Sequence, residues 1–550
     1  MMIYSFDIFD TCLVRKCGAP KNVFELLSMR VFRGEVSSEV RRTFVASRIE
    51  AEAKSWSEKQ SLDDIYDALQ FKHPQLLPKE CLKTLEMKIE QDMLVPVCEI
   101  SSLLNSIHEK NEQVLFISDM YLPSNFLQSI LEQNGLWRDG DRLYVSCECG
   151  ATKASGRLFQ KIQKEEHAEY KKWNHYGDNR HSDYVMPRRL GIKAHLVNHT
   201  YTPYQHKMNL LSDLCFQYCS ILGGMSRSIA LQTSRHPHKD FFIDIIAPLF
   251  TSFVFRVLKD AANRGIDSLY FCSRDAYPLY RIAMQLKYLF PCLSVHYLYI
   301  SRKSLYEGNR SNKLGYYAQI GLASKNSNNA IVDIRSRTKT LRVLNDLMLE
   351  NDYKALFGYF FEICPSCTSD LQGLDYHTEL DGLYISQISK LLRKLPSNWY
   401  LYELFFPLNT QKRTIGYDLQ KNIYVPIFES EHTAEYSLPN LQEWVDWREW
   451  ALNKYVNYFV ELELYNHADE IFVRYAIPQL ADFLSYPHKH YLNALVDFCG
   501  MQGDGIFLPY IDTSLLRLPL NVFKHKTMWK RGTIFATLPI WLCRWLYKNK

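Results

Sequence analysis

The sequence has 550 residues, of which 47% are hydrophobic and 23% are charged. A chain of this length exceeds what one hydrophobic core supports, so we expect at least two domains, and the hydrophobic content excludes an intrinsically disordered chain. The formal net charge of +5 is small for this length, which argues against a global basic field, and nucleic acid is not expected as a partner.

The cysteines predict a reducing compartment. The sequence contains 14 of them without regular spacing, and its CxxC at residues 364–367 lacks the second pair that a zinc site needs. No signal peptide is recognised at the start. Reduced thiols in the cytoplasm are therefore the simplest expectation.

The first predicted element is a short buried strand over residues 2–6, because this apolar stretch has no helical spacing. Asp7 would lie at its carboxyl end, which is where ligands bind in open α/β sheets. Polar residues with helically spaced apolar positions follow until about residue 110. They predict a helical insertion over about residues 14–110.

Three further segments bring polar residues to predicted strand ends. A buried strand over residues 114–117 ends in Ser118, the stretch "GATKASG" presents Lys153 before a helix, and a third strand runs into Asp178 with Asp183 close behind. This pattern predicts a doubly wound sheet with a site along its carboxyl edge. A carboxylate nucleophile, a hydroxyl, a lysine and further carboxylates are what phosphoryl transfer through an aspartyl-phosphate requires.

These four segments, "FDIFDT", "LFISD", "TKASG" and "GDNRHSD", resemble the motifs of the haloacid dehalogenase (HAD) superfamily, which is dominated by Mg²⁺-dependent phosphatases. The resemblance covers residues 1–205 and implies a HAD-like phosphatase domain with a helical cap. It implies that Asp7 is the nucleophile, that Thr11 is its loop partner, that Ser118 contacts phosphate and that Lys153 neutralises charge. The implied Mg²⁺ ligands are Asp7, the Phe9 carbonyl, Asp178 and Asp183.

Phe9 departs from the family pattern, because phosphatases of this family carry a second Asp two residues after the nucleophile, as the acid and base. An aromatic residue there is reminiscent of the dehalogenase branch, which uses no metal, whereas the pair Asp178 and Asp183 favours one. Asp10 is the nearest candidate for the missing acid, and a structural role in the loop is the alternative. A HAD fold that binds phosphate without hydrolysis stays open for the whole half.

The second half repeats a strand, a polar loop and a helix, which predicts another parallel sheet. The first strand ends before Ser273, Arg274 and Asp275, and the second before Arg302 and Lys303. The third ends in Asp333 and is followed by a basic and hydroxyl-rich loop, which contains Arg335, Arg337, Thr338, Lys339 and Thr340. Such loops at helix starts favour a polyphosphate, and solvated surface is the alternative.

These loops resemble those of the type I phosphoribosyltransferases in "IVDIRSRTKTL" and "LYFCSRDAYPLYRIA", with one acidic residue in place of the usual pair. The resemblance covers residues 206–380. It implies that Asp333 and the loop from Arg335 to Thr340 bind the ribose and 5-phosphate of phosphoribosyl pyrophosphate (PRPP), and that Ser273 and Arg274 bind pyrophosphate. Asp275 is the candidate that orients or deprotonates the acceptor, and a salt bridge is its ordinary alternative.

The pairing of the two domains resembles the two-part ribofuranosyltransferases of bacterial polysaccharide assembly. It implies transfer of 5-phosphoribose from PRPP to a lipid-linked saccharide, followed by Mg²⁺-dependent removal of the 5-phosphate, because PRPP delivers a ribose that still carries this phosphate. Two alternatives stay open. One is a HAD phosphatase for a phosphosugar with a non-catalytic second domain, and the other is a non-catalytic scaffold.

Residues 381–550 are predicted to be helical and rich in aromatic residues, and to complete the second domain. Trp444, Trp447 and Trp450 share one helical face, for which packing is favoured over sugar stacking. The basic stretch at residues 524–550, with its Trp and Leu residues, suits a segment that lies on an anionic membrane, and a terminal helix docked on the core is the alternative. We therefore expect a cytoplasmic protein that is peripheral on the inner face of the cell membrane.

Overall fold

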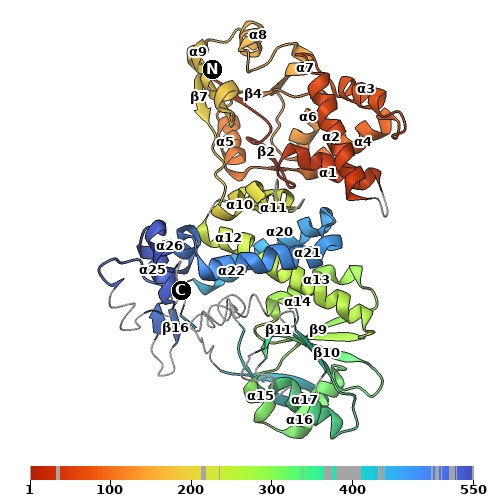
Figure 1. Ribbon diagram of the computed structural model, residues 1–550. Coiled ribbons are helices and arrows are strands. Elements are labelled where there is room, and N and C mark those ends of the chain that lie inside the picture. The colour runs from red at the N-terminus through yellow and green to blue at the C-terminus, as the bar shows by residue number, and fades with distance from the viewer. Residues whose placement is uncertain are drawn as a thin grey trace. The chain divides into compact units, whose positions relative to one another are not determined.

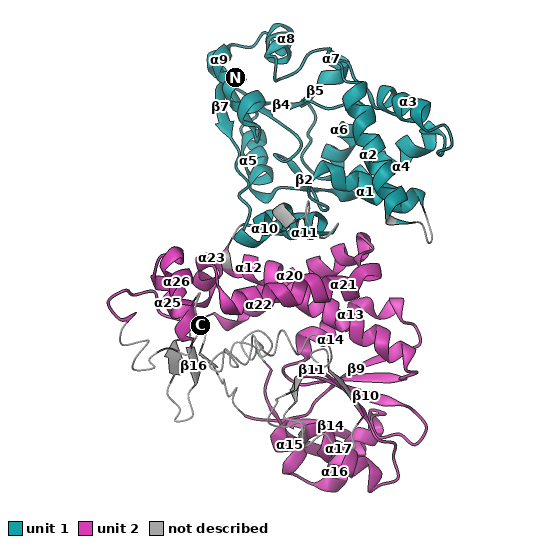
Figure 2. Ribbon diagram, viewed as in Figure 1, with its two compact units in different colours: residues 1–235 teal, residues 236–550 magenta. Residues whose placement is uncertain are grey.

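The computed structural model describes residues 2–32, 37–211, 218–234, 236–336, 339–363, 375–378, 411–430, 436–437, 440–496, 499–501, 507–509, 511–518, 527 and 529–547. They form two compact units, residues 1–235 and 236–550, which Figure 2 colours separately. Each unit contains a five-stranded parallel sheet with helices. The predicted α/β class with two parallel-sheet domains is confirmed.

The first sheet has the strand order β5-β4-β1-β6-β7. Its strands are β1 (Ile3–Phe6), β4 (Gln113–Ser118), β5 (Arg142–Val145), β6 (Trp173–Gly177) and β7 (Lys193–Leu196). The central strand β1 pairs with β4 on one side and β6 on the other, so the strand order reverses between β1 and β6. Ligands bind at such a switch point in doubly wound sheets. Asp7 follows β1 and Asp178 follows β6, so both flank it.

Helices cover the first sheet, which explains why its inner strand β4 is apolar without a break over residues 114–117. On one face, Leu158 and Ile162 of α8 (Arg157–Glu165) pack with Leu115 and Ile117 of β4. The other helices around this sheet are α5 (Cys98–Glu109), α6 (Ser124–Gln133), α7 (Ser146–Cys149) and α9 (Met186–Leu190).

A helical insertion separates β1 from β4, as predicted. It begins and ends at an antiparallel ribbon in which Leu13 of β2 pairs with Pro96 of β3. Its elements are β2 (Leu13–Arg15), α1 (Pro20–Val31), α2 (Ser38–Lys54), α3 (Leu62–Lys72), α4 (Lys79–Met93) and β3 (Leu94–Pro96). The insertion therefore closes at residue 96, earlier than the expected 110, because α5 contacts β4 of the sheet instead.

Two helices beyond residue 205 belong to the first unit, which therefore extends past the expected boundary. They are α10 (Pro203–Leu211) and α11 (Cys219–Leu231). A Cβ at Gly224 of α11 would lie 2.2 Å from the Cα of Gly18, so only glycine permits this approach. The amide of Asn22 donates to the Ser220 hydroxyl beside it, at 2.8 Å. Close backbone packing thus holds α11 against the loop that follows β2.

The second sheet has the strand order β12-β11-β10-β8-β9. Its strands are β8 (Ser268–Cys272), β9 (Ser294–Leu298), β10 (Asn329–Ser336), β11 (Phe357–Ile363) and β12 (Tyr376–Thr378). The order reverses between β8 and β10. β10 continues to Ser336, beyond the expected end at Asp333, because it stays paired with β11 there. Its pairing with β8 stops at Val332, so Asp333 lies at the level where β8 ends.

Helices lie on both faces of the second sheet (Figure 1). On one face, Phe253 of α13 packs edge-on against Phe361. On the other, Leu341 of α17 and Tyr317 of α16 share a core with Ile331 and Phe360. The helices of this unit's sheet layer are α13 (Ala247–Asn263), α14 (Tyr277–Leu286), α15 (Arg302–Tyr306), α16 (Arg310–Gln319) and α17 (Lys339–Leu349).

The region after residue 380 completes the second unit, but it is not purely helical. A hairpin of β13 (Thr414–Gln420) and β14 (Ile423–Phe428) packs through Tyr417 on Tyr316, with ring centroids 4.4 Å apart. A small antiparallel sheet follows, made of β15 (Tyr436–Ser437), β16 (Cys499–Met501) and β17 (Phe507–Pro509). The α-helices among the described residues of this region are α20 (Leu441–Glu461), α21 (Ala468–Ile471), α22 (Ile477–Ser485), α23 (Lys489–Leu492), α25 (Lys530–Thr537) and α26 (Ile540–Tyr547).

The tryptophans of α20 mainly serve packing. Trp444 is 3% exposed and its ring lies 4.0 Å from that of His238, while Trp447 packs on His236 at 4.9 Å. Trp450 is partly buried. The prediction of packing over sugar stacking is thus confirmed for Trp444.

One continuous helical run, residues 238–263, is long and apolar enough to cross a membrane. It combines α12 (Pro237–Phe241), the π-helical turn η3 (Phe242–Ile246) and α13. Within the structure 94% of its most apolar window is buried, as in the core helix of a folded domain.

Candidate active site at the edge of the first sheet

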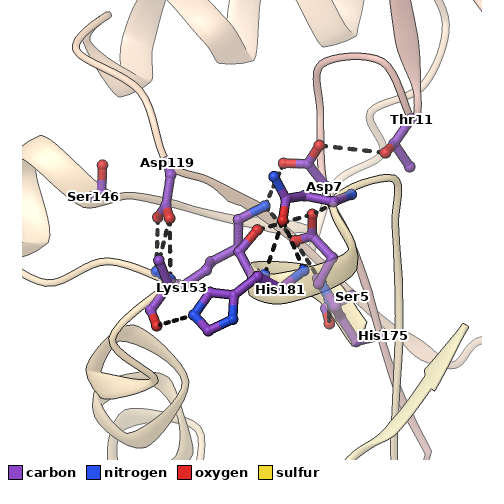
Figure 3. A network of polar contacts seen from close by, with 12 residues as sticks. Ser5, Asp7, Thr11, Asp119, Ser146, Lys153, His175 and His181 are labelled. Carbon is purple, nitrogen blue, oxygen red and sulfur yellow. Dashed lines mark hydrogen bonds and ion pairs between the residues drawn. The ribbon is translucent and has the colours of Figure 1, made fainter. Parts of the chain in front are cut away.

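Asp7 lies immediately after β1, where the chain turns away from the sheet. Its amide donates to the carbonyl of Tyr176 in β6 at 2.8 Å, which fixes the turn on the neighbouring strand. Its carboxylate receives the Lys153 ammonium on Oδ1 at 2.5 Å and the Thr11 hydroxyl on Oδ2 at 3.3 Å. Figure 3 shows both contacts. The predicted nucleophile, loop partner and lysine therefore meet at one carboxylate.

Lys153 reaches the site from the loop before α8. The carboxylate of Asp119, which follows β4, accepts the Lys153 amide at 2.8 and 3.0 Å and so holds this loop (Figure 3). The Lys153 side chain is buried, and its ammonium also lies 2.7 Å from Oδ1 of Asp183. Burial alone would lower the pKa of Lys153, but Asp7, Asp183 and Asp119 together raise it. Lys153 is thus a fixed positive charge between two carboxylates.

A buried chain of polar contacts orients Asp183. The indole of Trp173 donates to the Ser5 hydroxyl at 2.7 Å, and Ser5 lies 2.8 Å from Nδ1 of His175. Nε2 of His175 lies 3.1 Å from Oδ1 of Asp183. Burial lowers the pKa of His175, which favours the neutral ring. In the neutral ring Nε2 donates its proton to Asp183 and Nδ1 accepts the proton of the Ser5 hydroxyl. All three hydrogen bonds then donate in the same direction, toward Asp183.

The turn after β6 requires glycine. A Cβ at Gly177 would lie 2.5 Å from both Cβ and Cγ of Asp183. The Asn179 amide donates to Asp183 Oδ2 at 3.1 Å, within a π-helical turn η2 (Arg180–Val185). The absence of a side chain at residue 177 therefore lets the Asp183 carboxylate fold back toward the end of β6.

Asp7, Asp178 and Asp183 form a carboxylate cluster that fits Mg²⁺. One oxygen of each lies within 4.8 Å of the others, and hard oxygen donors are the ligands that Mg²⁺ prefers. Two of the three predicted side chains are buried, and Asp178 is exposed, which leaves a path from solvent. The structure thus brings together the three side-chain carboxylates, those of Asp7, Asp178 and Asp183, that were predicted to hold the ion.

The pKa values show that negative charge in this cluster is only partly compensated. Burial raises the pKa of Asp7 to about 8, against the opposing effect of Lys153 and with a further rise from Asp183. Burial raises the pKa of Asp178 to about 6, and Asp10 and Asp183 contribute. The pKa of Asp183 is lowered, because Lys153 and His175 outweigh its burial. A divalent cation would supply the missing positive charge.

Phe9 and Asp10 follow Asp7 in the loop after β1, and Phe9 stands two residues after the predicted nucleophile. The guanidinium of Arg15 lies over the Phe9 ring at 4.5 Å, and Arg15 itself binds Glu90 with two nitrogens. Asp10 has a positive φ of 54°, and its carboxylate accepts from Arg227 of α11 at 2.8 Å. The structure therefore gives Asp10 a structural partner, which was the alternative to its role as an acid.

Ser118 is the last residue of β4 and is 1% exposed, so it lies at the predicted edge of the sheet. The sequence reasoning missed four residues of this site, namely Ser5, Asp119, His175 and Arg227. Ser5 and His175 carried a signal, because each is a polar residue in an apolar strand and the two are register partners. Asp119 directly follows Ser118. Arg227, in contrast, carried no local signal, since it is more than 200 residues from its partner Asp10.

Replacing His175 should weaken Mg²⁺ binding without unfolding the protein. His175→Asn keeps an amide near Ser5 but loses the donor to Asp183, and we expect about tenfold lower Mg²⁺ affinity, the usual cost of losing a partner behind a metal ligand. His175→Gln places an amide donor nearer Asp183 and should lose less. Isothermal titration of Mg²⁺ measures both, with thermal unfolding as the control. Equal affinities in both variants and the parent would contradict the positioning role.

The second unit places some of its predicted residues at a comparable edge. Asp275 follows β8 and Asp333 lies beside the end of β8, at the switch point of the sheet. Burial raises the pKa of Asp333 to about 7, and the nearby Asp275 carboxylate adds to the rise. The Ile334 amide donates to Asp333 Oδ1 at 2.8 Å. The two carboxylates therefore lie close enough to interact.

The other predicted residues of this unit differ in what they contact. The Ser273 hydroxyl donates to the Ile300 carbonyl at 2.7 Å and accepts the Ile300 amide at 2.9 Å, so it joins the ends of β8 and β9. Arg274 follows it, Arg302 and Lys303 are exposed at the start of α15, and Thr340 is half-buried in α17. Arg337 and Thr338 lie outside the described residues, as do the side chains of Arg335 and Lys339.

No protein-family model and no curated protein matches the chain. Among solved structures the chain is similar to a HAD-family enzyme from Bacteroides thetaiotaomicron, with 13% identity and a TM-score of 0.29 over 38% of this chain and 98% of that one. It is also similar to the HAD-hydrolase YfnB from Bacillus subtilis bound to magnesium, with 14% identity and a TM-score of 0.28 over 36% and 90% of the two chains. A third is L-2-haloacid dehalogenase from Xanthobacter autotrophicus with chloropropionic acid covalently bound, with 10% identity and a TM-score of 0.30 over 40% and 86%.

Proposed function

We propose that the first unit is a Mg²⁺-dependent phosphatase of the HAD type, which works through an aspartyl-phosphate at Asp7. One observation carries this proposal. The Asp7 carboxylate is held by Lys153 and Thr11 within a cluster with Asp178 and Asp183, whose oxygens lie within 4.8 Å of one another. A carboxylate so placed beside a lysine and further carboxylates is suited to attack phosphorus.

The proposed reaction has two steps. An Asp7 oxygen forms a bond to phosphorus while the bond from phosphorus to the ester oxygen breaks, and the released alcohol oxygen takes a proton from solvent. Water then attacks the phosphorus, the bond from phosphorus to the Asp7 oxygen breaks, and the proton of the water passes to solvent, which releases inorganic phosphate and regenerates the Asp7 carboxylate. Lys153 and Ser118 would hold the phosphoryl oxygens, and Thr11 would orient Asp7. Bound by Asp7, Asp178, Asp183 and the Phe9 carbonyl, Mg²⁺ would offset the repulsion between the two anions.

Phosphate release should require Mg²⁺, and Asp178→Asn should raise the Mg²⁺ concentration needed for half-maximal release by about a hundredfold, because a charged oxygen ligand is lost. Colorimetric phosphate detection with a panel of sugar phosphates measures this. Asp139→Asn removes an exposed carboxylate elsewhere in the unit and should change nothing. Release that is as fast in a chelator as in Mg²⁺ would contradict the metal-dependent mechanism.

We propose further that the second unit transfers 5-phosphoribose from PRPP to a saccharide acceptor. The acceptor oxygen would bond to the anomeric carbon as the bond from that carbon to pyrophosphate breaks, and the acceptor proton would pass to a base. The placement of Asp333 and Asp275 at the switch point supports this, since a carboxylate there suits a ribose hydroxyl or Mg²⁺. Asp275 is the candidate base. The basic loops with Arg274, Arg302 and Lys303 would bind the phosphates.

The two proposed activities fit one another chemically. Transfer from PRPP leaves a pentose that still carries a 5-phosphate, and the phosphatase would remove it to leave a ribofuranosyl residue. A lipid-linked glycan at the cytoplasmic face of the cell membrane is the proposed acceptor. Under the alternative of a phosphatase with a non-catalytic second unit, PRPP would yield no pyrophosphate. Under the alternative of a scaffold, neither product would form.

A further inference from the structure

The two C-terminal helices differ in how they contact the second unit. Trp529, just before α25, is 1% exposed and packs on Phe483 of α22, with ring centroids 5.5 Å apart. Phe535 of α25 packs on Tyr486 at 6.2 Å. A Cβ at Gly532 would lie 2.3 Å from the Trp529 ring, so the ring fills the space beside this glycine. α25 is therefore a docked helix of the folded unit.

α26 presents an apolar face to solvent instead. Trp541 and Trp545 are 68% and 67% exposed, and Ile540 is 43% exposed. At 100° per residue, Ile540, Trp541, Arg544 and Trp545 fall within one arc of about 140°. Cys543 lies outside this arc and is fully buried. The helix is thus apolar on its buried side and, apart from Arg544, also on its exposed side, where both indoles lie.

The charge of this end of the chain is entirely positive. No Asp or Glu follows Asp512 in the sequence, while eight basic residues do, namely Arg517, Lys524, Lys526, Lys530, Arg531, Arg544, Lys548 and Lys550. This excess of positive charge in the sequence, together with the exposed Arg544 between the two indoles, complements an anionic surface that also offers an apolar layer. A folded acidic protein would offer the charge but not the apolar layer beneath it.

We propose that α26 lies flat on an anionic phospholipid bilayer, with Trp541 and Trp545 at the level of the headgroups. The helix has 8 residues and so is about 12 Å long, well short of the roughly 30 Å of the hydrocarbon core, and it cannot span. Tryptophan favours the headgroup region because its ring is apolar and its N–H needs a polar partner. Arg544 beside the indoles would pair with lipid phosphate. None of the residues named for the proposed phosphatase and transferase sites belongs to α26.

Vesicle flotation of the full-length chain tests the proposal. The parent should bind vesicles of about three parts phosphatidylcholine to one part phosphatidylglycerol, and bind pure phosphatidylcholine at least about tenfold more weakly. The double variant Trp541→Ser with Trp545→Ser should lose about tenfold or more of its affinity for anionic vesicles. Arg544→Gln should lose roughly fivefold, and added salt should reduce that difference.

The matched control is Trp56→Ser, which removes an indole of similar exposure (71%) from the insertion of the first unit. It should bind vesicles like the parent, and all variants should keep the parent's unfolding temperature. Three outcomes would overturn the proposal. The first is equal binding of the parent to neutral and anionic vesicles. The second is an equal loss of vesicle affinity in the Trp56 variant and in the Trp541–Trp545 double variant. The third is a dimeric parent and a monomeric double variant, since the exposed face of α26 would then join two copies of the chain.

Discussion

Asp7→Asn should abolish phosphate release, with a loss of about 10⁴-fold or more, because an amide oxygen is a poor nucleophile and cannot form the acyl-phosphate. The substitution keeps the shape of the side chain, and the Thr11 hydroxyl can still donate to the remaining amide oxygen at residue 7. Lys153 would keep its second partner, Asp183, at 2.7 Å. The loss should therefore reflect chemistry and not the collapse of the site. Phosphate release from pentose 5-phosphates and other phosphomonoesters, measured under Mg²⁺ saturation, gives the rate.

The same variant separates the two proposed activities. With PRPP and a saccharide acceptor, Asp7→Asn should still release pyrophosphate at the parental rate and should accumulate a phosphorylated product, which mass spectrometry detects as one additional phosphate. Equal loss of both activities would contradict independent sites. Retained phosphate release in Asp7→Asn would refute the nucleophile, whatever the second unit does.

Asp333→Asn should lower PRPP-dependent pyrophosphate release by roughly 10²- to 10³-fold, because a partly buried carboxylate that binds ribose hydroxyls or Mg²⁺ loses its charge. Burial and Asp275 already raise the pKa of Asp333 to about 7, which means that its surroundings disfavour the ionised form. Such raised pKa values are common for carboxylates at functional sites. Pyrophosphate formation coupled to a colour reaction measures the rate.

The matched control for Asp333 is Asp346→Asn, which removes an exposed carboxylate from α17 in the same unit. It should leave pyrophosphate release unchanged. Phosphate release by the first unit should also stay unchanged in Asp333→Asn. If the parent itself releases no pyrophosphate with any acceptor tested, the transferase proposal fails while the phosphatase proposal stands on its own assay.

Local sequence patterns determined the elements that carry the site. A short apolar run that ends in a carboxylate or a hydroxyl specifies a buried strand with a polar residue at its rim, and this pattern placed Asp7, Ser118 and Asp178 correctly at strand ends. The alternation of strand, polar loop and helix likewise predicted both parallel sheets. Such signals are local, because burial of a strand or of one helix face imposes a period on neighbouring residues.

Only the tertiary structure decided which of these groups meet and which are engaged elsewhere. Lys153 lies 146 positions from Asp7 in the sequence yet 2.5 Å from it in space, and Arg227 binds Asp10 across 217 positions. The Ser273 hydroxyl, predicted for pyrophosphate, bonds to the backbone of Ile300, and β10 extends past Asp333 because β11 pairs with it. These outcomes depend on strand register and on close packing such as that of Gly18 with Gly224. Contacts between distant segments are set by the packing of whole layers, which no local pattern encodes.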